Sequence, residues 1–499
     1  MAFAQSRLYK PALVLLAAAL LASSFFSERK LNQLRGSLGF TRVTPLENAP
    51  PMLVMTTVVL GGFRGLIANA LWVRAMELQD EDKYFEMVQL ADWITKLQPH
   101  MVTVWVVQAW NMSYNISIKF SDPPDRWAWV NRGISLLRDE ALKYNPHEVL
   151  LYRELAWQFQ HKMGMNLDDA HMYFKNVWAS EMQEVLGSGR PNFDELINPK
   201  TDEAKARVKV LREKYKMDPV KMKEVDDRYG PLEWRFPETH AIYWAQLGRD
   251  MAKTPQDLIT LRRVIFQSMQ LAFQRGTLIQ NPDKSYRIGP NLDIIPKANA
   301  SYEEMMAEDP EMRDNISRAH KNFLLNSVYS LYVHNRLREA NQWLDVVKKK
   351  YPKDYNPNLS LDEFALSQVA EDLGDTNMDK TTADIMGFLE QAYQNLALGE
   401  DDQYTSLIRL ARNMWTRYTS KIRGGPSDKR VSLAPLEDMS KEVLDRMLDP
   451  EKGLRPQLAA QLRTKLNLPA PTNAPPTEAT SPNPPAPRSA STNSVAPPK

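Results

Sequence analysis

The sequence of 499 residues contains no cysteine and little glycine (19 residues). Without cysteine the chain has no disulfide bond, no thiolate zinc site and no cysteine nucleophile. A long chain without cysteine fits an oxidising compartment, although a cytosolic protein can also lack it. Scarce glycine combined with abundant leucine, alanine, methionine, glutamate, glutamine and lysine favours helices over short strands. We therefore predict an all-α protein.

An excess of charge of one sign is also missing. The chain has 63 basic and 61 acidic residues, a formal net charge of +2. This balance, together with the absence of a basic stretch interleaved with aromatic residues, predicts no nucleic-acid partner. His147-Glu148 lacks the second histidine of a zinc-peptidase motif, and neither a phosphate-binding glycine loop nor a nucleophile elbow occurs. We predict no catalytic residue, no metal and no cofactor.

One acidic and histidine-containing stretch could be interpreted as a metal site. Asp168, Asp169 and His171 are close in sequence, and His161 precedes them. On a helix Asp168 and His171 share a face while Asp169 turns away from it. Asp168 is better interpreted as an ordinary acid at a helix amino terminus, where it stabilises the helix dipole. The stretch therefore predicts no metal site.

The amino terminus carries the longest apolar run, residues 11–26, which follows Arg7 and Lys10. A basic start, an apolar centre and the small residues at 22–24 outline a cleavable signal peptide. The bulky pair Phe25-Phe26 and a length close to that of a bilayer favour an uncleaved transmembrane anchor. Residues 1–30 are thus expected to be a membrane anchor or a signal peptide, with the bulk of the chain outside the cytoplasm.

A second apolar stretch runs from Pro51 to Leu71. Arg64 interrupts it, and Gly61-Gly62 weakens it as a helix. We expect it to cap the first helices or to rest in the membrane interface, with a second membrane span as the alternative.

From Leu71 onward, apolar residues recur at spacings of three and four, which predicts one helix after another. The predicted pairs are Leu71–Glu77 with Tyr84–Leu97, Trp105–Lys119 with Arg126–Tyr144, Glu148–His161 with Asp168–Glu184, a helix at Trp244 with Leu258–Arg275, and Phe323–Val333 with Arg338–Lys349. Further helices are expected near 361–372, 380–398, 402–422 and 436–447.

The same packing offsets recur in these pairs. Met87, Ala91, Ile94 and Pro99 have the spacing of Ala340, Leu344, Val347 and Pro352. Tyr152, Leu155, Ala156 and Phe159 follow Pro146, and Trp244, Leu247 and Gly248 repeat a Trp-x-x-Leu-Gly opening. In these offsets the chain resembles the tetratricopeptide repeat superfamily, which implies an α-solenoid of helical hairpins.

The expected organisation follows from this pattern. It comprises the anchor or signal (1–30), a linker and capping segment (31–70), tetratricopeptide-like repeats (71–184), a charged insertion (185–236), a further repeat-like pair (237–276), a loop region (277–315), degenerate helical repeats (316–468) and a disordered proline-rich tail (469–499). The two long insertions depart from the regular repeat.

Residues 61–184 also resemble membrane-anchored bacterial repeat proteins of unassigned role, through Gly61-Gly62-Phe63-Arg64-Gly65 and the segment 93–99. This resemblance implies a single-pass protein of the bacterial inner membrane whose bulk is periplasmic.

In such solenoids the first helix of each pair lines the concave face, where partners usually dock. The resemblance therefore implies that this face carries the partner-binding residues Trp110, Tyr114, Arg153, Trp157, Gln160 and His161. Aromatic anchors flanked by polar groups suit an extended peptide or a partner helix. The alternative is that Trp110 and Trp157 pack between the repeats and the insertion at 185–236.

Together these expectations describe a membrane-tethered scaffold that binds a protein partner in the cell envelope. The alternatives are an envelope enzyme whose site is built by the insertions at 185–236 and 277–300, and a structural subunit of a secretion or export machine.

The expected orientation is directly testable. A reporter that is active only outside the cytoplasm, fused after residue 40, should be active in bacterial cells because Arg7 and Lys10 hold the short end inside. A silent reporter, in a strain where the same reporter works behind a known export signal, would rule this orientation out.

Overall fold

The structure is a computed structural model that describes residues 9–37, 63–187, 189–280, 286–334, 336–352, 360–361, 363–365, 377–423 and 431–469. The predicted disordered tail, apart from Pro469, lies outside the described residues, as do residues 38–62 of the predicted linker. The chain divides into two compact units, an amino-terminal unit (Met1–Leu151) and a carboxy-terminal unit (Tyr152–Lys499).

Helices make up nearly all of the regular structure, which confirms the all-α prediction. Within the described residues the only strands are β1 (Thr277–Gln280) and β2 (Tyr286–Gly289), which form an antiparallel hairpin.

The amino-terminal unit contains α1 (Tyr9–Ser37), α3 (Phe63–Asp80), α4 (Tyr84–Leu97), α5 (Val102–Trp110), the π-helical η2 (Asn111–Ile116), the short 3₁₀ turn η3 (Ser117–Lys119), α6 (Pro123–Ser135), the π-helical η4 (Leu136–Ala141) and α7 (Leu142–Tyr144). Helix α8 (Val149–Trp157) crosses the boundary between the units. Helix α4 has the predicted bounds, and the predicted pair at 105–144 corresponds to α5 through α7.

The core of this unit begins where α3, α4 and α5 pack together. Ala68, Ala91, Ile94 and Val104 are buried there, so the predicted apolar stripe of α4 faces inward. The next junction is polar: the carbonyl of Pro99 accepts hydrogen bonds from Trp105 Nε1 and Asn145 Nδ2, both at 2.8 Å. Pro99 ends one helix pair, and its carbonyl fixes the start of the next.

Helix α1 is exposed, and its residues are mainly apolar as far as Phe26. Every side chain that is described in it is exposed, including Leu15 (71%) and Phe26 (66%). Within the part of the chain that the structure describes, no helix has both the length and the apolar character needed to cross a membrane.

The carboxy-terminal unit continues from α8 into the π-helical η5 (Gln158–Gly164). It then contains α9 (His171–Leu186), α10 (Phe193–Ile197), α11 (Asp202–Glu213), α12 (Pro219–Tyr229), α13 (Pro237–Met251), α14 (Pro255–Arg275), the hairpin, the 3₁₀ turn η6 (Leu292–Ile294), α15 (Ile295–Glu308), α16 (Arg313–Val333), α17 (Leu337–Lys350), α19 (Met378–Leu398), α20 (Asp401–Ile422), α22 (Leu436–Met447) and α23 (Pro456–Lys465).

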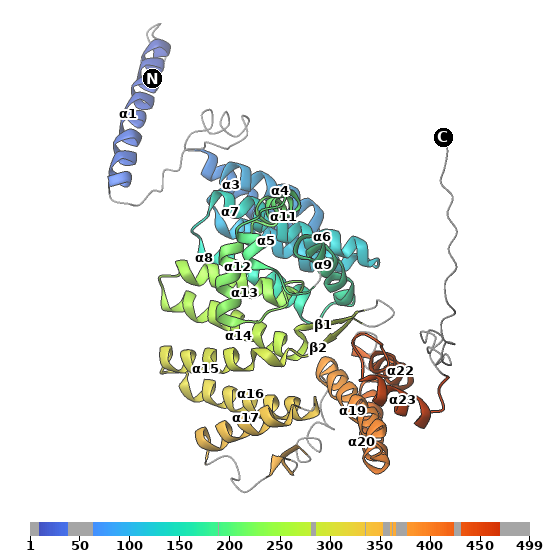
Figure 1. Cartoon of the computed structure of the whole chain (residues 1–499). Coiled ribbons are helices and arrows are strands. Elements are labelled where there is room, and N and C mark those ends of the chain that lie inside the picture. Colours follow the sequence, from blue (N-terminus) through green and yellow to red (C-terminus); the bar gives the residue numbers. More distant parts are fainter. Residues whose placement is uncertain are drawn as a thin grey trace, which may run out of the picture. The chain divides into compact units, whose positions relative to one another are not determined.

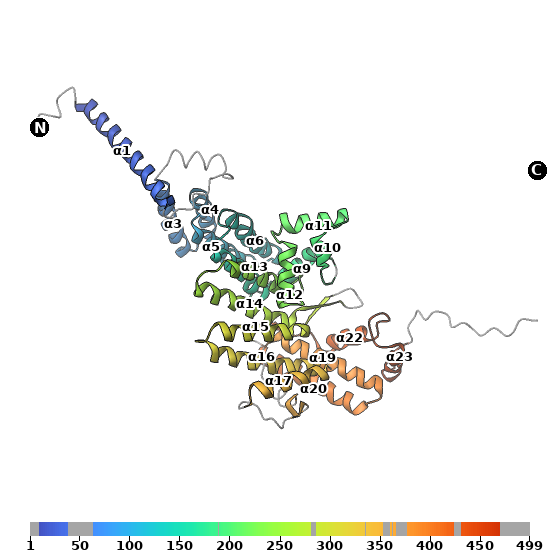
Figure 2. The same cartoon turned by 60° about the vertical axis from the view of Figure 1, so that its left-hand side comes forward.

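Consecutive helices of this unit pack on one another. Helix α13 packs on α14, α14 on α15, α15 on α16, and α16 on α17, and both views show these helices in succession (Figures 1 and 2). Gly248 allows close approach at the first of these pairs: a Cβ there would meet Tyr152 Cβ at 2.9 Å and Leu261 Cδ2 at 3.1 Å. The glycine of the Trp-x-x-Leu-Gly stretch is therefore required by packing.

Two segments differ from the expectation. The insertion at 185–236 was predicted only as a charged segment, but it contains α10, α11 and α12, which bury Leu196, Leu211 and Met222. Helix α13 nevertheless packs on η5, so after the insertion the chain returns to the preceding helix pair. The region 277–315 was predicted as loop, which is wrong for the hairpin and for α15.

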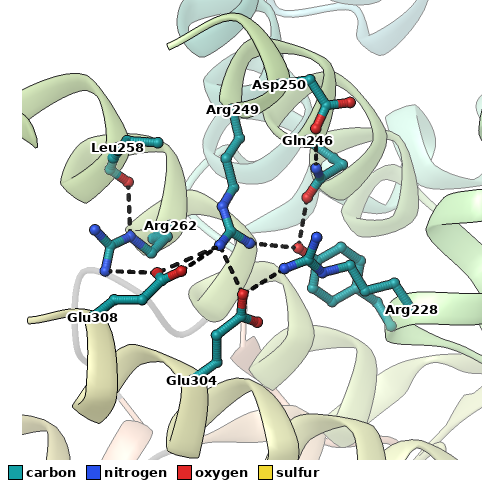
Figure 3. A network of polar contacts seen from close by, with 9 residues as sticks. Arg228, Gln246, Arg249, Asp250, Leu258, Arg262, Glu304 and Glu308 are labelled. Atoms are coloured by element: carbon teal, nitrogen blue, oxygen red, sulfur yellow. Dashed lines mark hydrogen bonds and ion pairs between the residues drawn. The ribbon is translucent and has the colours of Figure 1, made fainter. Parts of the chain in front are cut away.

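A polar network joins four helices of this unit (Figure 3). The Arg249 guanidinium donates to Glu304 at 2.8 Å, to Glu308 at 3.1 Å and to the Tyr229 hydroxyl at 3.3 Å. Arg262 pairs with the same Glu308 carboxylate at 3.1 Å. Because these residues lie on α12, α13, α14 and α15, the network fixes how successive helices are placed.

A buried histidine links α15, α16 and the residue that follows α17. His320 has no exposed surface. Its Nδ1 lies 2.8 Å from the Tyr351 hydroxyl, and its Nε2 lies 2.8 Å from Asn299 Oδ1. One donor and one acceptor suit the neutral ring. Burial, assisted by the charge of Lys350, lowers the pKa of His320 to about 4, and Glu303 opposes this shift only weakly.

This histidine predicts a pH dependence of stability. The pKa of His320 in the folded protein lies below that of an unfolded histidine. The contribution of His320 to stability is therefore complete above about pH 6.5 and is lost as the pH falls toward 4. In the wild type the unfolding free energy should fall by about 3 kcal/mol over this range. We expect this fall to be absent in His320→Gln. Urea unfolding of the full chain in detergent at pH 7.5 and 4.5 measures the difference.

The exposed His147→Gln serves as the control and should retain the wild-type pH dependence. Parallel pH profiles for wild type and His320→Gln would contradict the assignment.

A candidate binding cleft over a buried charge network

Arg275, the last residue of α14, connects three other parts of the carboxy-terminal unit. The residue is 3% exposed. Its Nη1 donates to Asn166 Oδ1 at 3.1 Å and to Asp379 Oδ2 at 2.9 Å, and its Nη2 donates to the carbonyl of Gly164. Nε lies 3.6 Å from the Glu238 carboxylate. A single guanidinium thus holds the end of η5, the start of α13 and the start of α19.

Local sequence explains why these groups meet. Gly164 ends η5, and a Cβ there would lie 3.0 Å from the Phe159 carbonyl oxygen and 3.8 Å from Arg275 Nη2. Asn377 caps α19 by accepting from the backbone N–H of Lys380 at 3.1 Å. This cap places Asp379 in the first helical turn, where a carboxylate is favoured.

Lys175 of α9 adds a second buried cation. It is 3% exposed, and its Nζ lies 2.9 Å from Asn166 Oδ1 and 2.9 Å from His171 Nδ1. Burial and the nearby Arg275 charge lower the pKa of Lys175 well below its usual value, although Asp379 and Glu238 oppose this.

The two buried carboxylates respond in opposite ways. Burial raises the pKa of Glu238, whose Oε2 makes no hydrogen bond. Burial also acts to raise the pKa of Asp379, but the charges of Arg275 and Lys175 outweigh it, and the net pKa is lowered. Asp379 therefore stays ionised at neutral pH.

A cleft of about 740 Å³ opens beside this network. One wall is a face of α9, and other walls come from Phe236, the end of α14, the hairpin and the first turn of α19. The lining residues are Met172, Asn176, Ala179, Ser180, Gln183, Glu184, Phe236, Gln274, Arg275, Leu278, Ile288, Met378, Asp379 and Thr382. Leu278 and Ile288 are direct cross-strand partners in the hairpin, so they share one face of it. The volume is in the range of ligand sites.

The chemistry of the cleft fits binding better than proton transfer. Its carboxylates are Glu184, which is exposed, and Asp379, whose lowered pKa makes it a poor proton donor. Among the described residues no cluster of three or more histidine or acidic side chains could hold a metal ion. Asp168 instead pairs with Lys162 at 2.7 Å and accepts from the Ala170 N–H at 2.9 Å, as expected of an acid at a helix start.

Two of the predicted partner-binding residues form a stacked pair in the amino-terminal unit. Trp110 ends α5, and Tyr114 lies in the π-helical η2. Their ring centroids are 5.5 Å apart with an interplanar angle of 20°, and Trp110 is 39% exposed. Exposed Ile118 follows four residues later (53%).

The other four lie in the carboxy-terminal unit and include an equivalent pair. Trp157 ends α8, and His161 lies in η5, with ring centroids 4.4 Å apart and an interplanar angle of 12°. Arg153 pairs with Glu154 at 2.5 Å. Gln160 differs, since it is 3% exposed and donates to Gln267 of α14 at 2.7 Å. It is a packing residue in the structure and is not available at the surface.

The π-helical segments that follow the two tryptophans were not predicted from the sequence. Each tryptophan is the last α-helical residue before a π-helical segment. Such segments are rare and occur often at functional sites.

The residues of the charge network were missed at the sequence level. Lys175, Arg275 and Asp379 lie on amphipathic helices, where charged residues are normally solvated. The single sequence signal was the pair of insertions, because Phe236, Leu278 and Ile288 line the cleft and come from the segments 185–236 and 277–300.

No model of a known protein family matches the chain, and no curated protein and no solved structure is similar to it.

The network predicts strong energetic coupling. Arg275→Met should lower the unfolding free energy by about 3–5 kcal/mol because it removes the guanidinium that lies against Asp379 and the buried Glu238. Asp379→Asn should also lower the unfolding free energy. The variant with both substitutions should lose about 1–3 kcal/mol less than the sum of the two single losses. Urea unfolding of the four proteins measures the cycle.

Arg263→Met, an exposed change on the same helix, should cost less than about 0.5 kcal/mol. Additive effects of Arg275→Met and Asp379→Asn would show that the two side chains are not coupled.

Proposed function

We propose that this protein is a membrane-tethered helical-repeat scaffold of the bacterial cell envelope that binds a protein partner without covalent chemistry. In this proposal α1 holds the chain at the inner membrane, and the helical pairs lie outside the cytoplasm. The recurring offsets of the sequence support an α-solenoid of the tetratricopeptide type.

The packing order of the helices is consistent with a solenoid. Helices α13 to α17 contact their neighbours in chain order, as expected when a core grows by repetition. Tyr152 packs on Trp244, with ring centroids 6.3 Å apart. The repeat-like stretches that begin at these two residues therefore meet directly. Leu155, Ala156 and Phe159 are buried beside them.

The tether rests on the exposed apolar surface of α1. Leu13, Val14, Leu15 and Leu16 are 46–71% exposed, and the apolar residues continue to Phe26. An apolar helix surface of this size is unfavourable in water and is normally covered by lipid or protein. The basic residues Arg7 and Lys10 before it favour a membrane with the short end inside.

The observation that carries partner binding is the repeated aromatic pair. Trp110 with Tyr114, and Trp157 with His161, place stacked rings where α5 continues into η2 and where α8 continues into η5. Burial lowers the pKa of His161, and Lys162 adds to this shift, so the ring is neutral at pH 7. Partly exposed, pre-stacked aromatic residues are common anchors of protein interfaces.

A second candidate is an enzyme with its site in the cleft, favoured by the position of the cleft beside both insertions. The low pKa of Asp379 and the exposure of Glu184 weigh against paired acid–base carboxylates there. Binding is therefore the better-supported function of the cleft as well.

The aromatic pairs are tested by substitution in the full chain. Trp110→Ala and Trp157→Ala should leave the melting temperature within a few degrees of wild type, because both rings lie near the surface. Both should reduce capture of the partner, and Trp110→Ala should reduce partner crosslinking from a photoreactive amino acid placed at Ile118 in the same unit. Crosslinked products are identified by mass spectrometry and must be the same protein in repeated experiments.

Trp93→Ala, which removes an exposed tryptophan (47%) outside the pairs, is the control and should crosslink like wild type. Unfolding of Trp110→Ala and Trp157→Ala would show that the pairs are packing elements. If Trp93→Ala reduced capture of the partner as much as the other two variants, partner binding could not be assigned to the aromatic pairs.

A further inference from the structure

The cleft is a slot with a regular helical wall. Met172, Asn176 and Ser180 follow one another at intervals of four residues on α9, and Glu184 continues the row. All four side chains are exposed. Ala179 and Ser180 are small, so the backbone of a bound chain can approach the helix closely at the centre of the slot.

The remaining walls are mainly apolar. Leu278 and Ile288 from the hairpin, Phe236 and Met378 supply apolar surface, while Asn176, Ser180 and Thr382 supply amide and hydroxyl groups. Short polar groups of this kind can both donate to and accept from a peptide backbone. A mixed lining suits a chain that alternates apolar side chains with backbone amides.

The charge of the slot is negative. Among its lining residues the only cation is Arg275, and its guanidinium is engaged with Gly164, Asn166 and Asp379. Glu184 has no such counterpart among the lining residues. Asp379 is paired with the Arg275 guanidinium at 2.9 Å, so the charge that the slot presents to a ligand is that of Glu184. The slot therefore favours a ligand that carries positive charge.

We propose that this slot binds an extended segment of the partner protein in which basic side chains flank an apolar side chain. A basic residue pairs with Glu184, and the apolar residue packs on Leu278 and Ile288. This inference rests on the proposed binding function and adds the chemical class of the partner segment.

The test uses the full chain in detergent and fluorescein-labelled peptides with Gly-Ser flanks. The probe contains Lys-Thr-Leu-Thr-Lys, and the comparison peptides contain Glu-Thr-Leu-Thr-Glu and Lys-Thr-Ser-Thr-Lys. Fluorescence anisotropy should show saturable binding of the probe, at least about tenfold tighter than of either comparison peptide. Binding should weaken as salt is raised.

Variants locate the binding in the slot. Ser180→Trp places a large side chain in the slot and should weaken the affinity for the probe about tenfold or more. Glu184→Gln should weaken this affinity about threefold and reduce its salt dependence. Lys209→Trp and Glu213→Gln make the same kinds of change at exposed positions of α11 and should bind like wild type.

Other outcomes overturn the proposal. Equal binding of the acidic peptide, or unchanged binding in Ser180→Trp, excludes the slot as the site. Competition by spermidine as strong as that by unlabelled probe shows that the slot takes small cations instead of a peptide. If the probe does not bind while crosslinking at Ile118 still depends on Trp110, the slot proposal fails and the scaffold function stands.

Discussion

The burial of Arg275 is the constraint on which the carboxy-terminal unit depends. Its guanidinium can be buried only because Gly164, Asn166 and Asp379 accept hydrogen bonds from Nη1 and Nη2, and because the Glu238 carboxylate lies 3.6 Å from Nε. The desolvation of such a charge is costly, and removal of one partner leaves the others uncompensated. Segments separated by about a hundred residues in the sequence are therefore held in one arrangement, and this arrangement includes the floor of the cleft.

The same electrostatics determine what the cleft can do. Two cations and two carboxylates share the network, and they do not respond equally to burial: the pKa of Lys175 falls, that of Glu238 rises, and that of Asp379 falls. The carboxylate with the raised pKa is buried away from the cleft lining, while the one that lines the cleft is held as an anion. A fixed anion of this kind orients the cation with which it pairs, here Arg275, and it is poorly suited to giving up a proton.

Local pattern predicted the helices well and their irregularities poorly. The bounds of α4 follow from Met87, Ala91 and Ile94 at spacings of four and three, because one buried face repeats with the helix. The folding of the insertion at 185–236 was not predicted because it depends on specific pairings within the segment. Asp226 Oδ1, for example, accepts from the backbone of Leu232 and from Trp234 Nε1. A charged stretch with such internal partners looks the same in sequence as a solvated one.

The cleft could not be predicted for a related reason. In a stack of helical pairs most contacts join neighbours in the chain, and local offsets capture them. The cleft forms where the chain departs from this order, since α14 contacts both η5 and α19. Asp379 and Arg275 carry no local signature, because each is one charged residue among many on a helix. The insertions mark this interruption of the regular helical order in the sequence, and they supply Phe236 and the hairpin to the cleft lining. The charged residues of the cleft come from the regular helices.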